Sequence, residues 1–426
     1  MNPIARELND TIKGTLLDRV LSDFGRRIFF PRGIVAQTTE ATERAHRFNA
    51  TVGMASREGR PIMLPSLSRV IPDLSPDEAV SYAPTAGVPE LRRIWRDEIR
   101  KKNPTIGDAS FSLPAVVPGL TSGLSLVADL FFDPGNTLVL PDMYWGNYRL
   151  IADERHGASL ATFPFFSPAG ELDLDAFADT IRAVTGSKVL VLLNFPNNPT
   201  GYSPSFSEAE RIVSILTAEA ERRDIVVVLD DAYYGLFYER DTYTESLFAP
   251  LCRAHKNLLA IKVDGTTKEE FTWGFRIGFV TFGGASIDTT GHDVLVKKLM
   301  GAIRSSVSNS SRIAQSLLIR LLTSAEHEAE KRHEFETLKT RYRKIKEILA
   351  SRADHPRLRA LPFNSGYFMS FRCDGISAEA MRIALLDSGI GVISIDDVFI
   401  RIAFSGVDTE RLLELFDEVY RHAEAL

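Results

Sequence analysis

The chain has 426 residues, a net charge of −6 and only two cysteines. Its length allows one large domain and a smaller one, and two cysteines are too few for a disulfide framework, which fits a reducing, cytoplasmic compartment. Acidic and basic residues are mixed without the basic stripe that is typical of nucleic-acid-binding proteins, and no stretch approaches the roughly 18 apolar residues that span a membrane, so we expect small-molecule partners.

Short apolar runs alternate with helical stretches between residues 115 and 285, which predicts an α/β fold with a parallel sheet. The runs are rich in Val, Ile and Leu and are too short for buried helices. In chain order they are residues 137–141, 188–195, 224–231, 258–264 and 276–282. Ahead of the run at 224–231, Ser207 and Glu210 predict the capping box at the start of a helix.

A charged amphipathic segment without Gly or Pro covers residues 313–349 and predicts one long helix. Three strand-like runs and an amphipathic terminal segment follow it, at residues 366–371, 391–395, 399–404 and 408–426. We expect a large domain at residues 60–310. The small α+β domain is expected to combine residues 1–59 with 311–426, with the long helix near 311–350 between the two domains.

Polar residues follow several of the predicted strands, at the edge where open α/β sheets bind ligands. Asn198 lies in the turn NNPTG, Asp230 and Tyr233 lie in DDAYYG, and Lys268 follows the run at 258–264. The sequence GLTSG at residues 119–123 is typical of a helix N-terminus that could hold a phosphate group. Each feature alone is explained as well by a turn, a helix cap or a solvated charge.

Together, these groups are what the cofactor pyridoxal phosphate needs: an amine for a Schiff base, a carboxylate for the pyridine nitrogen and donors for the phenolic oxygen. A lysine in water has a pKa of about 10.4, so a Schiff-base lysine at 268 needs its pKa lowered by desolvation and by positive neighbours. Arg276, eight residues later, could supply such a charge while its guanidinium holds the phosphate.

From about residue 45 to 405 the chain resembles the fold type I pyridoxal-phosphate aminotransferases, especially the aspartate and aromatic aminotransferases. In TTKEEFTWGFRIG, Lys268 is followed after six, eight and ten residues by Gly274, Arg276 and Gly278, as in the family's lysine signature. The resemblance implies a large domain with a mostly parallel seven-stranded sheet between helices, and a smaller α+β domain. It also implies that Lys268 forms the internal aldimine and then moves a proton between the substrate's α-carbon and the cofactor.

The same resemblance assigns the cofactor contacts. Asp230 would pair with the pyridine nitrogen, and Asn198 and Tyr233 would hold the phenolic oxygen. Tyr82 would reach the phosphate of a neighbouring subunit, which implies a homodimer with shared active sites. The residues that would contact the phosphate or the ring within one subunit are Gly119, Leu120, Thr121, Trp145 and Arg276.

For the substrate, the resemblance implies that Arg401 clamps the α-carboxylate with its bidentate guanidinium and that the backbone at Gly53 closes over the substrate, next to Trp145 and Asn198. Arg304 is similar to the arginine that reads a side-chain carboxylate in the partner's pocket of dicarboxylate-specific members; a surface arginine is the alternative. The sequence departs from the family pattern at Gly265, where many members have a phosphate-binding serine, at Met143, and at Ser310 and Ser311, which replace prolines.

The predicted function is an aminotransferase that moves an amino group between an L-amino acid, which is aspartate, glutamate or an aromatic one, and a 2-oxo acid. A lyase of the same fold, such as a carbon–sulfur β-lyase or an aminocyclopropane-carboxylate synthase, is the alternative. A non-catalytic regulator that binds the cofactor is a remote one, because we expect such a protein to carry a basic DNA-binding segment. No metal site is expected, since His327 and His333 lie on different helix faces.

Overall fold

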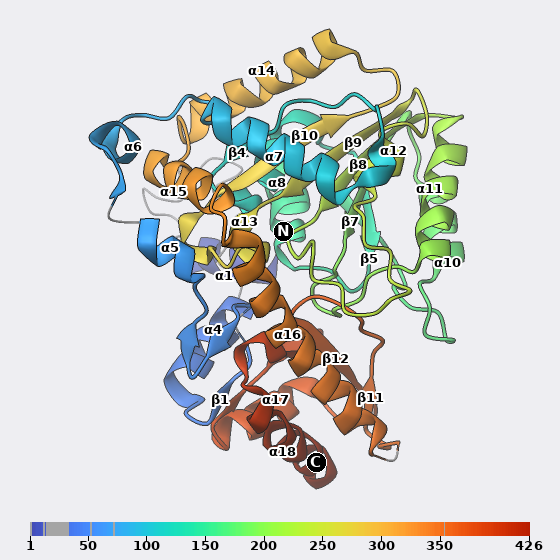
Figure 1. Ribbon diagram of the computed structural model, residues 1–426. Helices are drawn as coiled ribbons and strands as arrows, with labels where there is room; N and C mark the ends of the chain where they lie inside the picture. Colours follow the sequence, from blue (N-terminus) through green and yellow to red (C-terminus); the bar gives the residue numbers. More distant parts are fainter. Residues whose placement is uncertain (1, 12, 14–33, 52, 71–72, 353) are drawn as a thin grey trace.

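The computed structural model describes residues 2–11, 13, 34–51, 53–70, 73–352 and 354–426. In this part of the chain a seven-stranded sheet forms the centre of a large unit, and a four-stranded antiparallel sheet lies in a smaller unit below it (Figure 1). Residues 1, 12 and 14–33, which belong to the predicted small domain, lie outside the described residues.

The strands of the large sheet follow the order β4-β10-β9-β8-β7-β5-β6. β10 runs antiparallel to both of its neighbours, and every other neighbouring pair is parallel. The five predicted runs are confirmed as β5, β7, β8, β9 and β10, whereas β4 and β6 were not predicted. The bounds are β4 (Ala115–Val117), β5 (Thr137–Pro141), β6 (Ser159–Phe163), β7 (Lys188–Asn194), β8 (Asp224–Asp230), β9 (Leu258–Asp264) and β10 (Gly278–Gly283).

Helices cover both faces of this sheet. Successive residues of a strand point to opposite sides, so each strand contributes side chains to two cores. Val226 and Val228 of β8 pack into the core beside α8 (Leu120–Phe131) and α14 (Thr289–Ser306). Val227 and Leu229 belong to the core of the other face. The helices of that face are α7 (Pro89–Lys102), α10 (Leu174–Ala183) and α11 (Phe206–Ala220). Burial on both faces explains why these strands are continuous apolar runs, and it confirms the predicted α/β fold class.

The start of α11 shows that the predicted capping box was wrong. Ser205, not Ser207, accepts a hydrogen bond from the backbone N–H of Glu208, and the Glu208 side chain accepts one from the backbone N–H of Ser205. The sequence holds two overlapping Ser-x-x-Glu pairs, and the structure uses the first. A β-bridge to Thr242 keeps Ser205 in the extended conformation that an N-cap residue needs, and Glu210 is exposed.

The long helix that was predicted over residues 313–349 is interrupted in the structure. It is divided into α15 (Arg312–Leu322) and α16 (His327–Ala350). Between the two helices, the hydroxyl group of Ser324 accepts a hydrogen bond from the backbone N–H of Glu326 at 3.4 Å, a local side-chain contact that favours a turn over a continued helix. α15 packs on α5, α6 and α7 of the large unit, and only α16 continues toward the small unit (Figure 1).

The four-stranded sheet of the small unit has the order β11-β12-β15-β14, and β1 pairs with β13 in parallel. This pairing brings the segment near residue 48 beside the C-terminal part of the chain, while the domain boundaries at 60 and 310 stay predictions. The bounds are β1 (Phe48–Asn49), β11 (Leu358–Ala360), β12 (Phe368–Cys373), β13 (Ile390–Gly391), β14 (Ile393–Ile395), β15 (Phe399–Ala403), α4 (Ile34–Arg44), α17 (Ala378–Asp387) and α18 (Leu412–Ala425).

The remaining elements are short. They are α1 (Pro3–Thr11), β2 (Ser56–Arg57), β3 (Arg60–Pro61), α5 (Pro65–Val70), α6 (Pro76–Val80), α9 (Asn147–Arg149), α12 (Phe248–Leu251) and α13 (Thr266–Glu269). Among the described helices, none combines the length and the apolar character that a membrane crossing needs.

Candidate active site

A cavity of about 310 Å³ opens at the carboxyl ends of β7, β8 and β9. The small unit contributes Phe368 of β12 and Arg401 of β15 to its wall. Because the parallel strands end at one edge of the sheet, segments that lie far apart in the sequence meet here. The predicted site residues in the lining are Gly53, Leu120, Thr121, Trp145, Asn198, Asp230, Tyr233, Lys268, Arg276 and Arg401.

Lys268 lies in α13, directly after β9, and its amine points into the cavity. The Nζ atom donates a hydrogen bond to the backbone carbonyl of Gly53 at 2.6 Å and lies 5.2 Å from the centroid of the Tyr233 ring. Burial first, and then the positive charges of Arg276 and Arg401, lower the pKa of Lys268 to about 7. A large fraction of this amine is therefore neutral near pH 7, as a nucleophilic lysine must be.

Asp230, the last residue of β8, is a buried carboxylate at the base of the cavity. The hydroxyl group of Tyr148 donates to its Oδ2 atom at 2.6 Å, and the backbone N–H of Ala232 donates to its Oδ1 atom at 3.1 Å. Burial raises the pKa of Asp230 to about 6, while these two donors oppose the shift. The carboxylate is thus mostly ionised at neutral pH and can stabilise a positive charge in the cavity.

Arg401 joins the small unit to the large one. Its Nη1 atom donates to Oδ1 of Asn198 at 2.9 Å, and its Nη2 atom donates to the backbone carbonyl of Thr51 at 2.8 Å. The guanidinium carbon lies 4.4 Å from the centroid of the Phe368 ring, and the buried Nε atom has no partner among the described residues. Burial lowers the pKa of Arg401 to about 10, so it stays charged and is suited to a carboxylate ligand.

At the other end of the cavity, the N-terminus of α8 lies against the guanidinium group of Arg276. A Cβ atom at Gly119, which precedes α8 with φ of 86°, would lie 2.5 Å from the Nη2 atom of Arg276. Leu120 and Thr121, the first residues of α8, line the cavity next to this guanidinium. Free backbone N–H groups at a helix start and a bidentate guanidinium together suit a phosphate group.

The backbone before Lys268 explains one departure from the family pattern. A Cβ atom at Gly265 would lie 2.9 Å from the carbonyl oxygen of Ile277 and 2.9 Å from Cδ1 of Leu120, so a serine does not fit there without movement. Two residues later, the buried hydroxyl group of Thr267 has no partner among the described residues and Thr267 lines the cavity. An orphaned hydroxyl of this kind indicates a ligand with acceptor oxygens.

Aromatic rings shape the middle of the cavity. The Tyr233 ring packs edge-on against Phe368 at a centroid distance of 5.3 Å, and the Trp145 ring packs edge-on against Tyr148 at 5.6 Å. Burial raises the pKa of Tyr233, which keeps its hydroxyl protonated and able to donate. A Cβ atom at Gly53 would approach Phe368 to 3.0 Å, so the close approach of the Gly53 carbonyl to the lysine depends on glycine.

Three predicted residues lie outside the cavity lining. Gly119 lies against the guanidinium group of Arg276, which itself lines the cavity. Tyr82 is 92% exposed, and Arg304 is exposed in the last turn of α14, where it donates to the hydroxyl of Ser308 at 2.6 Å. Because the roles of Tyr82 and Arg304 depend on a neighbouring subunit, both roles stay predictions.

Several lining residues were not predicted. Tyr148 lies three residues after Trp145, and Thr267 lies directly before Lys268, so both could have been found by extending known motifs. The others were not singled out, although Asn194 lies near the end of a predicted strand and Ala232 lies within DDAYYG. They are Thr38, Thr51, Asn194, Ala232 and Phe368.

Residues 55–419 match the family model described as aminotransferase class I and II. The aspartate/prephenate aminotransferase of Thermus thermophilus is 25% identical over 318 residues, which cover 73% of this chain and 74% of that protein. A solved aminotransferase from Anaerococcus prevotii superposes with a TM-score of 0.83 at 25% identity and covers 94% of this chain and 98% of its own. The kynurenine aminotransferase of Pyrococcus horikoshii, solved with PMP, shares the fold at 16% identity, with a TM-score of 0.79 over 96% of this chain and 98% of its own.

Proposed function

The chain belongs to the class I and II aminotransferases, and from this premise we propose which residues hold its pyridoxal 5′-phosphate, which residue moves the proton and which substrates it takes. When bound, this cofactor withdraws the electron pair that remains on the substrate's α-carbon after a proton has been removed. The protein's own task is to hold the reacting groups, to move the proton and to bind the substrate.

Asp230 holds the pyridine nitrogen, and Asn198 and Tyr233 hold the phenolic oxygen. The hydrogen bond from Tyr148 supports this role of Asp230, because it keeps a buried carboxylate ionised and oriented. The amide oxygen of Asn198 faces Arg401, so its NH₂ group remains as a donor toward the cavity.

Arg276, Thr121, Thr267 and the first backbone N–H groups of α8 hold the phosphate. The contact between Gly119 and the Arg276 guanidinium supports this assignment. It places a cation beside the positive N-terminus of α8, and both of these positive groups attract an anion such as a phosphate. The orphaned hydroxyl of Thr267 supplies a donor on the side where Gly265 excludes a serine.

Lys268 takes the proton from the substrate's α-carbon and returns one in the second half-reaction. Its pKa of about 7 supports this role, because an acid–base group works best when its pKa is near the working pH. The hydrogen bond to the Gly53 carbonyl and the nearby ring of Tyr233 hold the amine in one place.

Arg401 binds the α-carboxylate of the substrate, and the donor is aspartate, glutamate or an aromatic amino acid that reacts with a 2-oxo acid. The rings of Trp145 and Phe368 in the cavity wall and the names of the relatives from Thermus thermophilus and Pyrococcus horikoshii support this range of substrates. Arg304 is proposed to read a side-chain carboxylate in a partner's pocket.

The protein works as a cytoplasmic homodimer with shared active sites. The exposure of Tyr82 at 92% and of Val80 at 82% supports a partner surface at this place, because large exposed apolar side chains gather at interfaces. Light scattering of the purified chain tests this part, and a monomer at micromolar concentration would contradict it.

The observation that carries the proposal is the meeting of the Lys268 amine, the Asp230 carboxylate and the Arg401 guanidinium in one cavity. The test loads the full chain with the cofactor and offers aspartate or phenylalanine with 2-oxoglutarate. We expect one glutamate for each 2-oxo acid formed from the donor. Release of free ammonia in place of glutamate, or no amino transfer from any donor, would instead contradict the proposal.

A further inference from the structure

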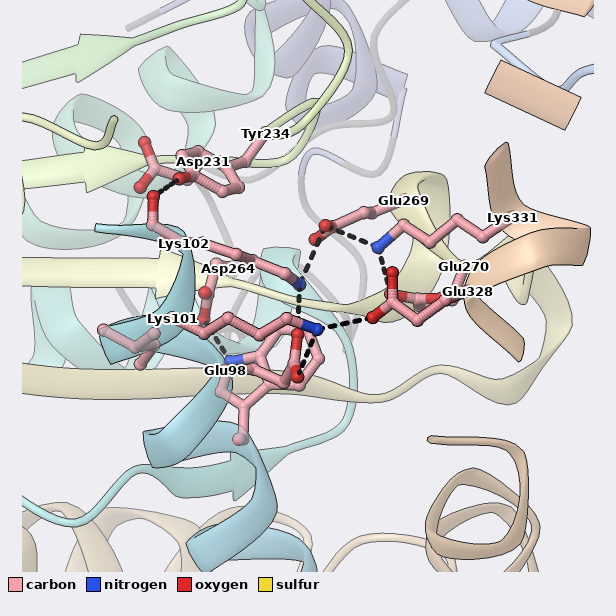
Figure 2. A network of polar contacts seen from close by, with 12 residues as sticks. Glu98, Lys101, Lys102, Asp231, Tyr234, Asp264, Glu269, Glu270, Glu328 and Lys331 are labelled. Carbon is pink, nitrogen blue, oxygen red and sulfur yellow. Dashed lines mark hydrogen bonds and ion pairs between the residues drawn. The ribbon is translucent and has the colours of Figure 1, made fainter. Parts of the chain in front are cut away.

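A cluster of buried charges lies behind Lys268, between the large sheet, α7 and α16. Figure 2 shows Asp231, Asp264, Glu269 and Glu270 among the lysines of these elements. At its centre is Lys262, a residue of β9 that is 1% exposed. A lysine in the middle of a buried strand is costly to desolvate, and its presence needs a reason beyond packing.

Lys262 connects the ends of two neighbouring strands. Its Nζ atom forms ion pairs with the carboxylate of Asp231 and, at 3.3 Å, with the carboxylate of Asp264. Asp231 directly follows Asp230 at the end of β8, and Asp264 ends β9 four residues before Lys268. The bridge therefore joins the two chain segments that carry the carboxylate and the amine of the cavity.

Additional donors fix both carboxylates of the bridge. The indole N–H of Trp95, in α7, donates to Oδ1 of Asp264 at 3.0 Å, and the hydroxyl of Ser246 donates to Oδ2 of Asp231 at 2.6 Å. The Lys262 ammonium also lies 4.6 Å from the centroid of the Tyr234 ring. A fully satisfied buried network of this kind has a single arrangement and makes its surroundings rigid.

The bridge does not line the cavity of about 310 Å³, so it contacts neither substrate nor cofactor there. We propose that Lys262 is a positioning residue of the amino transfer: by joining Asp231 to Asp264, it sets the separation between Asp230 and Lys268. This inference rests on the proposed roles of those two residues. A misplacement of about 1 Å in a reacting pair costs about 100-fold in rate, which gives a positioning bridge its value.

The test uses a variant that removes the three charges together, Asp231→Asn/Lys262→Met/Asp264→Asn. Because no buried charge is left without a partner, the variant is expected to fold with a thermal stability close to that of the wild type. We expect its kcat to fall about 100-fold and its KM to change much less, since Arg401 is untouched. The pH midpoint of the visible absorbance of the cofactor-loaded protein is expected to shift as well.

A second variant, Lys262→Met/Asp264→Asn, cuts the bridge without changing the net charge. If its absorbance midpoint shifts as in the triple variant, position and not charge is the cause. The matched control is Lys101→Met, which removes an exposed ion pair to Glu328 on the same side of the molecule and should change neither kcat nor the midpoint.

Each outcome decides the matter. If the variants fold and keep the wild-type kcat and midpoint, the proposal is overturned. It is also overturned if the triple variant is as unstable as Lys262→Met alone, because the bridge is then only a stabilising element. Failure of the proposed function is seen separately: if Lys268→Ala keeps the visible absorbance of the bound cofactor, the lysine has no such role, whatever the bridge variants do.

Discussion

The two sides of Lys268 differ in how their charges are compensated. On the cavity side, the Lys268 amine and the guanidinium groups of Arg276 and Arg401 share one carboxylate of the described lining, Asp230, and the buried Nε atom of Arg401 has no partner among the described residues. On the far side, lysines alternate with carboxylates, and the ammonium of Lys331, for example, lies 2.7 Å from both Glu269 and Glu270 (Figure 2).

The difference is visible in the pKa values of three lysines, of which Lys262 is buried and Lys102 and Lys268 are half-buried. Burial lowers the pKa of each, and at Lys268 the neighbouring arginines lower it further, to about 7. At Lys102 and Lys262 the carboxylates of Glu269 and Asp231 outweigh burial and raise the pKa. The amine that we propose to react is thus surrounded mainly by cations, whereas the ammonium groups of Lys102 and Lys262 are paired with carboxylates.

The largest effect is expected from removing the amine of Lys268, which lies between the two sides. Lys268→Ala should lower kcat by at least about 10³-fold, because the acid–base group and the attachment of the cofactor are lost together. The visible absorbance of the loaded protein should disappear, while the thermal unfolding transition remains. Steady-state turnover and an absorbance spectrum measure both effects, and turnover within tenfold of the wild type would exclude this lysine.

The second prediction concerns the paired side. Lys262→Met leaves the carboxylates of Asp231 and Asp264 buried without their cation and should lower the free energy of unfolding by about 3–5 kcal/mol. Lys101→Met, which removes an exposed pair, should cost less than about 1 kcal/mol. Urea denaturation of the two variants measures the contrast. Equal losses would show that burial does not distinguish the two pairs.

The sequence predicted the strands of the sheet better than the residues around the reactive groups. Strands such as β8 are buried on both faces and therefore appear as continuous apolar runs, whereas β4 is only three residues long and β6 buries only its last residue, Phe163. The helix over 313–349 was predicted as one piece because no Gly or Pro marks the interruption between Leu322 and His327.

For the site, Lys268, Asp230 and Arg276 were predicted because they occupy strand ends or a spaced motif, and all three line the cavity. Tyr148 was missed although it lies only three residues after Trp145, because its contact with the Asp230 carboxylate is visible only in the fold. Lys262 lies within a predicted strand, two residues before Asp264 and therefore on the same face, but its second partner, Asp231, reaches it only through the pairing of β8 with β9.

The third prediction tests the lowered pKa of Lys268 in the cofactor-free chain. Between the folded pKa of about 7 and the ordinary value of 10.5, the unfolded chain binds more protons at this lysine than the folded chain does. The contribution of Lys268 to stability therefore rises with pH in this window, by at most about 1.4 kcal/mol per pH unit. Urea denaturation of the wild type and of Lys268→Met at pH 7, 8 and 9 should give a difference that grows in favour of the wild type. A difference independent of pH would mean that the amine is charged in the folded state.

The smallest effect is expected for the carboxylate of Asp230, on the cavity side. Tyr148→Phe removes the hydroxyl that donates to Asp230 at 2.6 Å, so the pKa of Asp230 should rise above its value of about 6. More of the carboxylate is then protonated at neutral pH, and the acidic limb of the kcat profile should move to higher pH.

Losing one hydrogen bond to a charged group costs about 1.5 kcal/mol, so kcat at pH 7 should fall about tenfold. Tyr202→Phe, which removes a hydroxyl that donates to Glu208 at 2.9 Å outside the cavity, is the matched control and should leave the pH profile unchanged. If both variants gave the wild-type profile, the charge on Asp230 would not depend on Tyr148. The neighbouring cations alone would then keep the Asp230 carboxylate ionised. Asp230 would no longer be a cavity group whose charge depends on a hydrogen bond from outside the pair of charges.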